Sequence, residues 1–187
     1  KMEMEKAKQR MKNIFIFTHQ LSNGESRTVE VHSGPLTING KQVLYSIIHD
    51  ITDRIRRDKE IEYLSFHDQL TGLYNRRFYE VELKRLDTAR NLPISIIMAD
   101  VNGLKLVNDA FGHSEGDNLL LIVRDILKNA CREDDIISRI GGDEFVILLP
   151  NTDKNETEAR LKRLEDAVKS TKIGSLQLSL SFGYETR

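Results

Sequence analysis

Two glycines and two acids interrupt the most strand-like part of the chain, RIGGDEFVILLP at residues 139–150. Isoleucines lead into the glycines, and the apolar run from Phe145 to Leu149 follows until Pro150 ends it. Gly-Gly between two such runs predicts a β-hairpin, because glycine reaches the positive φ that tight two-residue turns require. Asp143 and Glu144 are then expected side by side at the hairpin tip. Acids are common in solvated turns, so a function for this pair requires partners elsewhere in the chain.

The composition is that of a globular protein without an obvious polyanionic partner. The 187 residues are 39% hydrophobic and 30% charged, which allows one or two domains with a buried core. A formal net charge of −1 gives no electrostatic reason to expect a nucleic-acid or membrane surface. No apolar run approaches the ~18 residues of a membrane span, and no signal peptide is recognisable.

The single cysteine, Cys131, fits a reducing compartment, and we expect a cytoplasmic location. Because the first residue is Lys1, we also expect the chain to be a segment of a longer protein. An upstream region could attach that protein to a membrane.

The first fifty residues predict a small antiparallel meander behind a weak, charged helix over residues 1–12. Asn-Gly pairs at 23–24 and 39–40 are strong hairpin signals between the expected strands. Three strands are too few for an independent domain, so we interpret the meander as the end of a larger one. The expected strands are residues 13–19, 26–33 and 41–50.

Three histidines lie in these strands. His19, His32 and His49 alternate with apolar residues, and their spacing shows no grouping typical of metal ligands.

From Asp50 the apolar period changes from that of a strand to that of a helix. Ile51, Ile55, Ile61 and Leu64 fall roughly on one stripe, with charges of both signs between them. Such a helix is either a solvated connector or a dimerising coiled-coil segment, and residues 51–66 are too short to decide between them.

The remainder alternates between helices and strands, which predicts an α+β domain with a mostly antiparallel sheet and helices on one face. The segment 93–101, PISIIMADV, is typical of a strand buried on both faces. Ser114 and Asp117 resemble a helix capping box. Helices are expected from Asn75 to Leu86 and over residues 104–109, 114–130 and 155–169, and a last strand over 175–183.

The strand ending in Asp100 supplies the missing partner for the hairpin acids. If this strand lies beside the hairpin, Asp100 faces Asp143 and Glu144, and three converging carboxylates repel one another unless a divalent cation neutralises them. Oxygen ligands favour Mg²⁺ or Mn²⁺, and this arrangement suits metal-assisted phosphoryl transfer. Simple turn and cap roles for the same acids remain the alternative.

Three sequence blocks also resemble a known family. GGDEF (141–145), HDQLTGLYNRR (67–77) and DVNGLKLVNDAFGHSEGD (100–117) are similar, in order and separation, to the motifs of the GGDEF family of diguanylate cyclases. The end of the meander, SIIHDITDRIRR, resembles the exit of a PAS sensor domain. The resemblance divides the chain into a partial PAS domain (1–50), a helical signalling linker (51–66) and a GGDEF domain (67–187).

The resemblance implies a nucleotide-cyclase-like, palm-like fold and an activity that joins two GTP into cyclic di-GMP with release of two pyrophosphates. Each domain would hold one GTP, so catalysis would need a homodimer. Asp143 would be the general base for the ribose 3′-hydroxyl. Mg²⁺ would be bound by Asp100, the Val101 carbonyl and Glu144, with Asp143 as a shared ligand.

The same resemblance assigns substrate-binding residues. Asn108 and Asp117 would recognise guanine, whose N1–H and 2-amino group a carboxylate accepts together. Lys105 and the backbone N–H groups of Gly103 and Leu104 would bind the phosphates. Gly141 and Gly142 would let the backbone approach the nucleotide. The alternatives are helix caps for Asn108 and Asp117 and plain surface for Lys105.

Arg132 and Asp135 form an R-x-x-D pattern at the family position of an inhibitory product site. Arg132 would bind a guanine or phosphate of cyclic di-GMP, and Asp135 would accept from guanine. The alternative is an ordinary charged loop.

Two departures from the family pattern are visible. Asn102 stands where many members carry a second acid, but its side chain is not an expected ligand. The family continues beyond the last strand, whereas this chain stops at Arg187, so we expect an uncovered sheet edge and fewer phosphate contacts. A catalytically inactive receptor for GTP or cyclic di-GMP, and a dimerising relay, therefore remain alternative functions.

Overall fold

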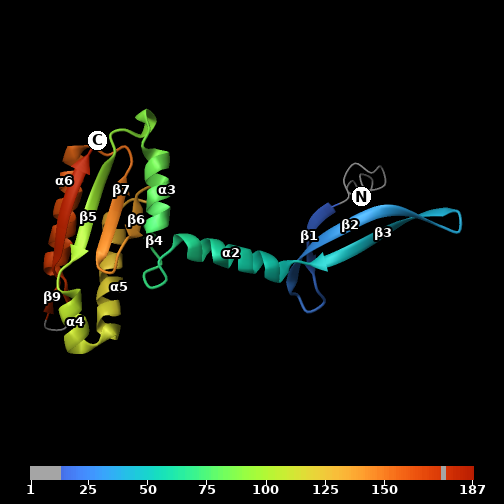
Figure 1. Ribbon diagram of the computed structural model, residues 1–187, viewed down its shortest axis with the longest axis horizontal. Coiled ribbons are helices and arrows are strands. Elements are labelled where there is room, and N and C mark those ends of the chain that lie inside the picture. Colours follow the sequence, from blue (N-terminus) through green and yellow to red (C-terminus); the bar gives the residue numbers. More distant parts are fainter. Residues whose placement is uncertain (1–13, 174–175) are drawn as a thin grey trace. The chain divides into compact units, whose positions relative to one another are not determined.

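The computed structural model describes residues 14–173 and 176–187 and separates two compact units, residues 1–62 and 63–187 (Figure 1). The helix expected over residues 1–12 lies outside the described residues. Within the described residues, no helix is long and apolar enough to cross a membrane.

The first unit contains the expected antiparallel meander. Its strands β1 (Ile14–Gln20), β2 (Ser26–Ile38) and β3 (Lys41–Asp50) pair in the order β1-β2-β3. Asn39 and Gly40 join β2 to β3 with φ values of 50° and 75°, the left-handed conformation that both central residues of a type I′ turn require. The Asn-Gly signal therefore predicted this hairpin correctly.

Helix α2 (Thr52–Phe66) follows β3 directly and buries none of its residues. Its start is attached to the meander, because the Thr28 N–H donates to Thr52 Oγ1 at 2.8 Å and the Ile51 N–H donates to the Thr28 carbonyl at 2.9 Å. The Asp50 carboxylate accepts from the Thr52 N–H at 2.9 Å. The helix covers most of the predicted connector, and its role as a linker stays a prediction.

The second unit is built on a mixed five-stranded sheet with the order β10-β5-β7-β6-β4. Neighbouring strands in this sheet are antiparallel, except β4 and β6, which run parallel. Together with the helices that pack on it, this sheet confirms the predicted α+β class. The strand expected over 175–183 is divided, and residue 175 lies outside the described part. The sheet strands are β4 (Tyr74–Asn75), β5 (Ser95–Val101), β6 (Ile136–Arg139), β7 (Glu144–Leu149) and β10 (Leu180–Thr186); β8 (Lys172–Ile173) and β9 (Leu176–Gln177) form a separate ribbon.

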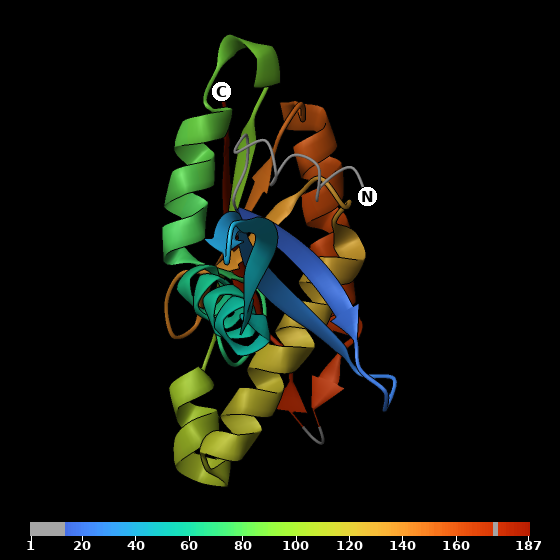
Figure 2. The same cartoon turned by 90° about the vertical axis from the view of Figure 1, so that its right-hand side faces the viewer.

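Helices cover both faces of this sheet, which corrects the expectation of helices on one face only. Helices α5 (His113–Ala130) and α6 (Lys154–Ser170) pack on the face that carries Ile97, Phe145 and Ile147. Helix α3 (Arg76–Leu86) packs on the opposite face, against Ile96 and Leu148. Figure 2 shows green α3 on one side of the strands and orange α6 on the other.

The strand β5 is more exposed than its sequence predicts. Ile97, Ala99 and Val101 are buried, whereas Met98, on the α3 face, is 40% exposed. The continuous apolar run therefore corresponds to one fully covered face and one partly covered face. The two remaining short helical segments are η1 (Ala89–Asn91) and α4 (Leu104–Phe111).

The helix starts differ in how they are capped. The Asn75 side chain accepts from the Phe78 N–H at the start of α3, where the sequence predicts a helix to begin. At α5 the predicted capping box of Ser114 and Asp117 is wrong, because the helix begins at His113 and its N-cap is Gly112, which makes no side-chain cap bond. The carboxylate of Asp117 is thus not used as a helix cap.

A buried ion pair attaches α6 to the loop before β6. The Arg160 guanidinium donates to Asp135 Oδ2, and the two side chains are only 1% and 3% exposed. The same carboxylate oxygen accepts from the Arg132 N–H at 2.6 Å. Arg160 Nε is buried without a hydrogen-bond partner, so the Asp135 carboxylate is what offsets the cost of burying the guanidinium charge.

We expect Asp135→Ala to lower the free energy of unfolding by about 3–5 kcal/mol, because it leaves the Arg160 charge buried and unpaired. Urea unfolding measures this change. Glu165→Ala is the matched control on the same helix, since Glu165 pairs with Lys169 at 3.8 Å on the surface and its loss should cost less than about 1 kcal/mol. Equal effects of the two substitutions would contradict the assigned role of the buried pair.

Candidate active site

The register of β5 and β7 places two acids directly opposite each other. Asp100 at the end of β5 is the pairing partner of Glu144 at the start of β7. The Val101 N–H donates to the Asp143 carbonyl at 3.0 Å, which holds the residue before β7 at the same strand end. Asp100 and Glu144 are exposed, and Asp143 is partly exposed. Like charges directly opposite on antiparallel strands destabilise a sheet, so this pair calls for a neutralising partner.

The residues at this strand end fit a bound Mg²⁺ or Mn²⁺ by their chemistry. Carboxylate and backbone carbonyl oxygens are the ligands that these hard cations prefer. Asp100 and Glu144 are paired across the two strands, and Val101 and Asp143 lie beside them, joined by their backbone hydrogen bond. Among the described residues the three acids do not form a group with ligand atoms within 4.8 Å of one another, so the expected convergence of their carboxylates is not observed. Solvent exposure of both carboxylates leaves room for a substrate phosphate in the shell of the cation.

The loop between β6 and β7 differs from the predicted two-residue turn. The Ile140 N–H donates to the Glu144 carbonyl at 2.9 Å, so the hairpin closes around several residues, and neither Gly141 nor Gly142 has a positive φ. A Cβ at Gly141 would lie 2.6 Å from Glu144 Oε2, whereas one at Gly142 would meet nothing within 4 Å. Gly141 therefore makes space for the Glu144 carboxylate.

Arg139 holds this loop against the first motif of the second unit. Its Nη2 donates to the Gly142 carbonyl at 2.7 Å, and its Nη1 donates to Asp68 Oδ1 at 3.1 Å. The Asp68 carboxylate also accepts from the Thr71 N–H and hydroxyl at 2.8 and 2.6 Å. Partial burial would raise the pKa of Asp68, but the hydrogen bonds from Thr71 and the contact with Arg139 outweigh it and lower that pKa.

The contact between Arg139 and Asp68 was not predicted from sequence, although Asp68 lies inside the first recognised block and Arg139 lies two residues before GGDEF. From sequence, one could see only an arginine shortly before the glycine-rich loop, Arg139, and an acid in HDQLTG, Asp68. Nothing in the sequence joins two residues that lie 71 positions apart.

The α4–α5 pair brings Asn108 and Asp117 into one region. Gly103 precedes α4 with φ 77° and Gly112 separates the two helices with φ 87°, conformations that favour glycine. Asn108 lies on α4 across from the buried Gly116 of α5, where a Cβ would lie 1.9 Å from Asn108 Oδ1. Gly116 was also missed from sequence, although a glycine inside a helix often has a packing reason.

The expected phosphate-binding groups lie at the start of α4. Gly103 is its N-cap and Leu104 its first residue, so their N–H groups belong to the positive end of the helix. Lys105 is exposed in the first turn. A mostly apolar cleft beside α4, lined by Leu106 and Phe111 among others, includes neither Asn108 nor Asp117.

Arg132 and Asp135 line a second cleft, together with His67 and Tyr74. The Arg132 side chain is 65% exposed, whereas the Asp135 carboxylate is almost fully buried and bonded to Arg160. The neighbouring Cys131 is a protonated thiol at neutral pH, because burial and then the charge of Asp135 raise its pKa to about 12. Arg132 pairs with Glu156 at 4.0 Å on the surface, so of the two residues it is the one whose side chain can turn toward a ligand.

The chain matches one family over most of its second unit. A family model described as "Diguanylate cyclase, GGDEF domain" matches residues 65–186. Diguanylate cyclase DgcM of Escherichia coli (strain K12) is 34% identical over 173 residues, which cover 89% of this chain and 42% of DgcM. The chain therefore spans less than half the length of that relative. The match is longer than the family domain, so it extends into the first unit.

Two solved structures share the fold. Diguanylate cyclase SiaD of Pseudomonas aeruginosa, in complex with its activator SiaC, is 30% identical with a TM-score of 0.62, over 73% of this chain and 57% of that chain. The coiled coil and GGDEF domain of DgcB from Caulobacter crescentus, in complex with c-di-GMP, is 23% identical with a TM-score of 0.66, over 72% of this chain and 76% of that chain. At 23% identity the second likeness shows the fold alone.

We expect Arg139→Gln to release the β6–β7 loop, because a neutral amide cannot reach both Asp68 and the Gly142 carbonyl as the guanidinium fork does. Loss of charge-assisted hydrogen bonds should speed amide exchange of Ile140 and Gly141 by roughly tenfold or more. Hydrogen–deuterium exchange measures this change. Arg124→Gln is the control, since Arg124 lies on α5 and pairs with the adjacent Asp125. Unchanged loop exchange in Arg139→Gln would contradict the role of the contact.

Proposed function

Because the chain belongs to the GGDEF family of diguanylate cyclases, we propose that it condenses two molecules of GTP into cyclic di-GMP and releases two pyrophosphates. The observation that most supports this activity is the pairing of Asp100 with Glu144 beside Asp143 at one strand end. Two opposing carboxylates and an adjacent third acid suit phosphoryl transfer at a metal site.

The proposed reaction uses Asp143 as the general base. The 3′-oxygen of one GTP bonds to the α-phosphorus of the other, and the bond between that phosphorus and the pyrophosphate oxygen breaks. Asp143 takes the proton that the 3′-hydroxyl loses. Asp100, the Val101 carbonyl and Glu144 would hold Mg²⁺ or Mn²⁺, with Asp143 sharing it. When bound, such a cation lowers the pKa of the hydroxyl and neutralises charge on the α-phosphate.

Residues of α4 and α5 would bind the rest of the nucleotide. The N–H groups of Gly103 and Leu104 face phosphate oxygens at a helix N-terminus, and exposed Lys105 adds a positive charge. Asn108 and Asp117 recognise the guanine edge. The absence of a capping role for Asp117 supports this assignment, because its carboxylate is exposed and makes no cap bond at the start of α5.

Two cyclase domains must face each other, since each holds one GTP and both 3′-hydroxyls react. We propose that the chain works as a homodimer and that α2 sets the geometry of its two cyclase domains. The three-stranded unit before α2 would be the end of a PAS sensor domain. Its direct attachment to the start of α2, through Thr28 and Thr52, supports a connection between sensing and catalysis.

Feedback inhibition would act at the cleft of Arg132 and Asp135. Arg132 would bind the guanine or phosphate of cyclic di-GMP, because its side chain is exposed. Asp135 would instead shape the cleft, since its buried carboxylate is engaged by Arg160 and by the Arg132 N–H. Arg132 is therefore the residue whose substitution tests inhibition without destabilising the fold.

Incubation with GTP and Mg²⁺, followed by chromatography of the nucleotides, tests the activity. We expect cyclic di-GMP from the unaltered chain and about 10²–10⁴-fold less from Asp143→Asn, which keeps the shape of the side chain and removes the base. Asp134→Asn is the control, because Asp134 is an exposed acid outside the site. Equal product from Asp143→Asn would contradict the general-base role. GTP binding without product, in this chain and in the full-length protein, would instead indicate a receptor.

We expect Gly116→Ala to weaken GTP binding by roughly tenfold or more. The guanine base would lose its hydrogen bond to the Asn108 amide, and a neutral hydrogen-bonding group left unpaired costs about this much. The new methyl group would force the Asn108 amide out of its position, and a flexible amide can move without unfolding α5. Calorimetric titration with GTP in Ca²⁺, which replaces Mg²⁺ as a hard cation, measures binding. Gly183→Ala is the control, since a Cβ there meets nothing within 4 Å. Equal affinities of the two variants would contradict the placement of Asn108.

A further inference from the structure

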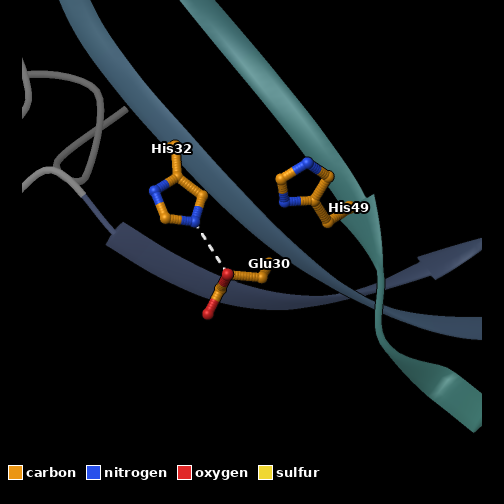
Figure 3. Close-up of side chains that lie close together, drawn as sticks. All are labelled: Glu30, His32 and His49. Carbon is orange, nitrogen blue, oxygen red and sulfur yellow. Dashed lines mark hydrogen bonds and ion pairs between the residues drawn. The ribbon is translucent and has the colours of Figure 1, made fainter. Parts of the chain in front are cut away.

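Strands β2 and β3 bring together three side chains whose atoms are metal ligands. Glu30 and His32 are two residues apart on β2 and therefore project from the same face. His49 on β3 is the pairing partner of Glu30, so it lies on that face as well. Figure 3 shows the three side chains gathered from the two neighbouring strands. The expectation that the strand histidines form no ligand-like group is wrong, because the partners come from different strands.

The distances within the group suit a single ion. One carboxylate oxygen and one nitrogen of each imidazole lie within 4.8 Å of one another, the one such three-ligand group among the described residues. Ligand atoms around a tetrahedral ion with bonds of about 2.1 Å lie roughly 3.4 Å apart. Modest side-chain rotations on a fixed pair of strands would therefore close the site.

The group is already partly organised. His32 Nε2 and Glu30 Oε1 share a hydrogen bond of 2.7 Å, and the His32 and His49 rings lie 5.8 Å apart at 64°. The hydrogen bond from His32 lowers the pKa of Glu30 against the opposing effect of burial, and the charges of His32, His49 and Arg54 act in the same direction as the hydrogen bond. The Glu30 and His32 side chains are 31% and 38% exposed, so an ion can reach them from solvent.

We propose that Glu30, His32 and His49 bind a divalent transition metal ion, with Zn²⁺ as the reference ion. Two imidazole nitrogens and one carboxylate oxygen are typical ligands of Zn²⁺ and of Co²⁺, Ni²⁺ and Cu²⁺. Mg²⁺ requires oxygen ligands and suits this group poorly, which separates it from the carboxylates at Asp100 and Glu144. An ion bound to His32 Nε2 takes the place of the proton that this nitrogen now shares with Glu30.

The position of the site gives metal binding a path to α2. His49 is followed by Asp50, whose carboxylate accepts from the first N–H of the helix, and Thr52 is bonded to Thr28 on β2. An ion that holds β3 to β2 at His49 fixes the strand that continues into this helix start. It also places positive charge near Arg54, which lies in the first turn of α2. The proposed site therefore lies next to the hydrogen bonds that hold the start of α2 to the meander.

Calorimetric titration of the metal-free chain with ZnCl₂, in excess Mg²⁺ to occupy the acidic site, tests the proposal. We expect one ion per chain and at least a tenfold loss of affinity in His32→Gln and in His49→Gln. His19→Gln is the matched control, a strand histidine of β1 outside the group, and should bind Zn²⁺ like the unaltered chain. Titration with Co²⁺ should give the visible absorption of a tetrahedral site in the unaltered chain and lose it in both variants.

Thermal unfolding without metal shows whether each variant still folds. His49 is exposed, so His49→Gln should unfold at the temperature of the unaltered chain. If His32→Gln unfolds at a lower temperature, the Zn²⁺ affinity of His49→Gln alone tests the proposal. Added Zn²⁺ should raise the unfolding temperature of the unaltered chain and of His19→Gln, but not of His49→Gln. Equal Zn²⁺ affinity in the unaltered chain and His49→Gln, or an equal loss in His19→Gln, would overturn the proposal.

Discussion

The antiparallel register of β5 and β7 is the constraint on which the rest of the second unit depends. It places Asp100 opposite Glu144, and the same alternation turns Ile97, Phe145 and Ile147 toward α5 and α6. A shift of one residue would exchange the two faces, burying the acids and exposing the core. The apolar side chains of the two strands therefore select the position of the acids. Stability of the sheet and alignment of the proposed metal ligands are two results of one pairing.

Much of the fold follows from local sequence. The Asn39-Gly40 turn, the start of a helix at Asn75 and the apolar strand before Asp100 were all predicted from residues within a few positions of each other. Expectations that depended on partners distant in sequence were less accurate. The placement of α3 on the second face required knowing which strands flank β5, and the starting residue of α5 depended on Gly112 rather than on the apparent capping box.

The residues of the candidate site also differ in whether local sequence could predict them. Asp143 and Glu144 stood out because two acids at a glycine-rich loop are locally unusual, and Asp100 because it ends an apolar strand. The family resemblance supplied the other residues. Gly116 and the contact between Arg139 and Asp68 matter through what they meet across the fold. The group of Glu30, His32 and His49 is another such case, because only the β2–β3 register makes His49 a neighbour of Glu30. Side-chain spacing along one strand contains no information on the next strand.

The contact between Arg139 and Asp68 also bears on where the GGDEF domain begins as a folded unit. The first strand of its sheet starts at Tyr74, yet the carboxylate that orients Arg139 lies six residues earlier, just after α2. A recombinant fragment cut at the first strand would keep every residue of the core sheet and lose the anchor of the β6–β7 loop. A fusion that replaces the first unit of this chain therefore calls for a junction inside α2, upstream of Asp68, and not at the edge of the sheet.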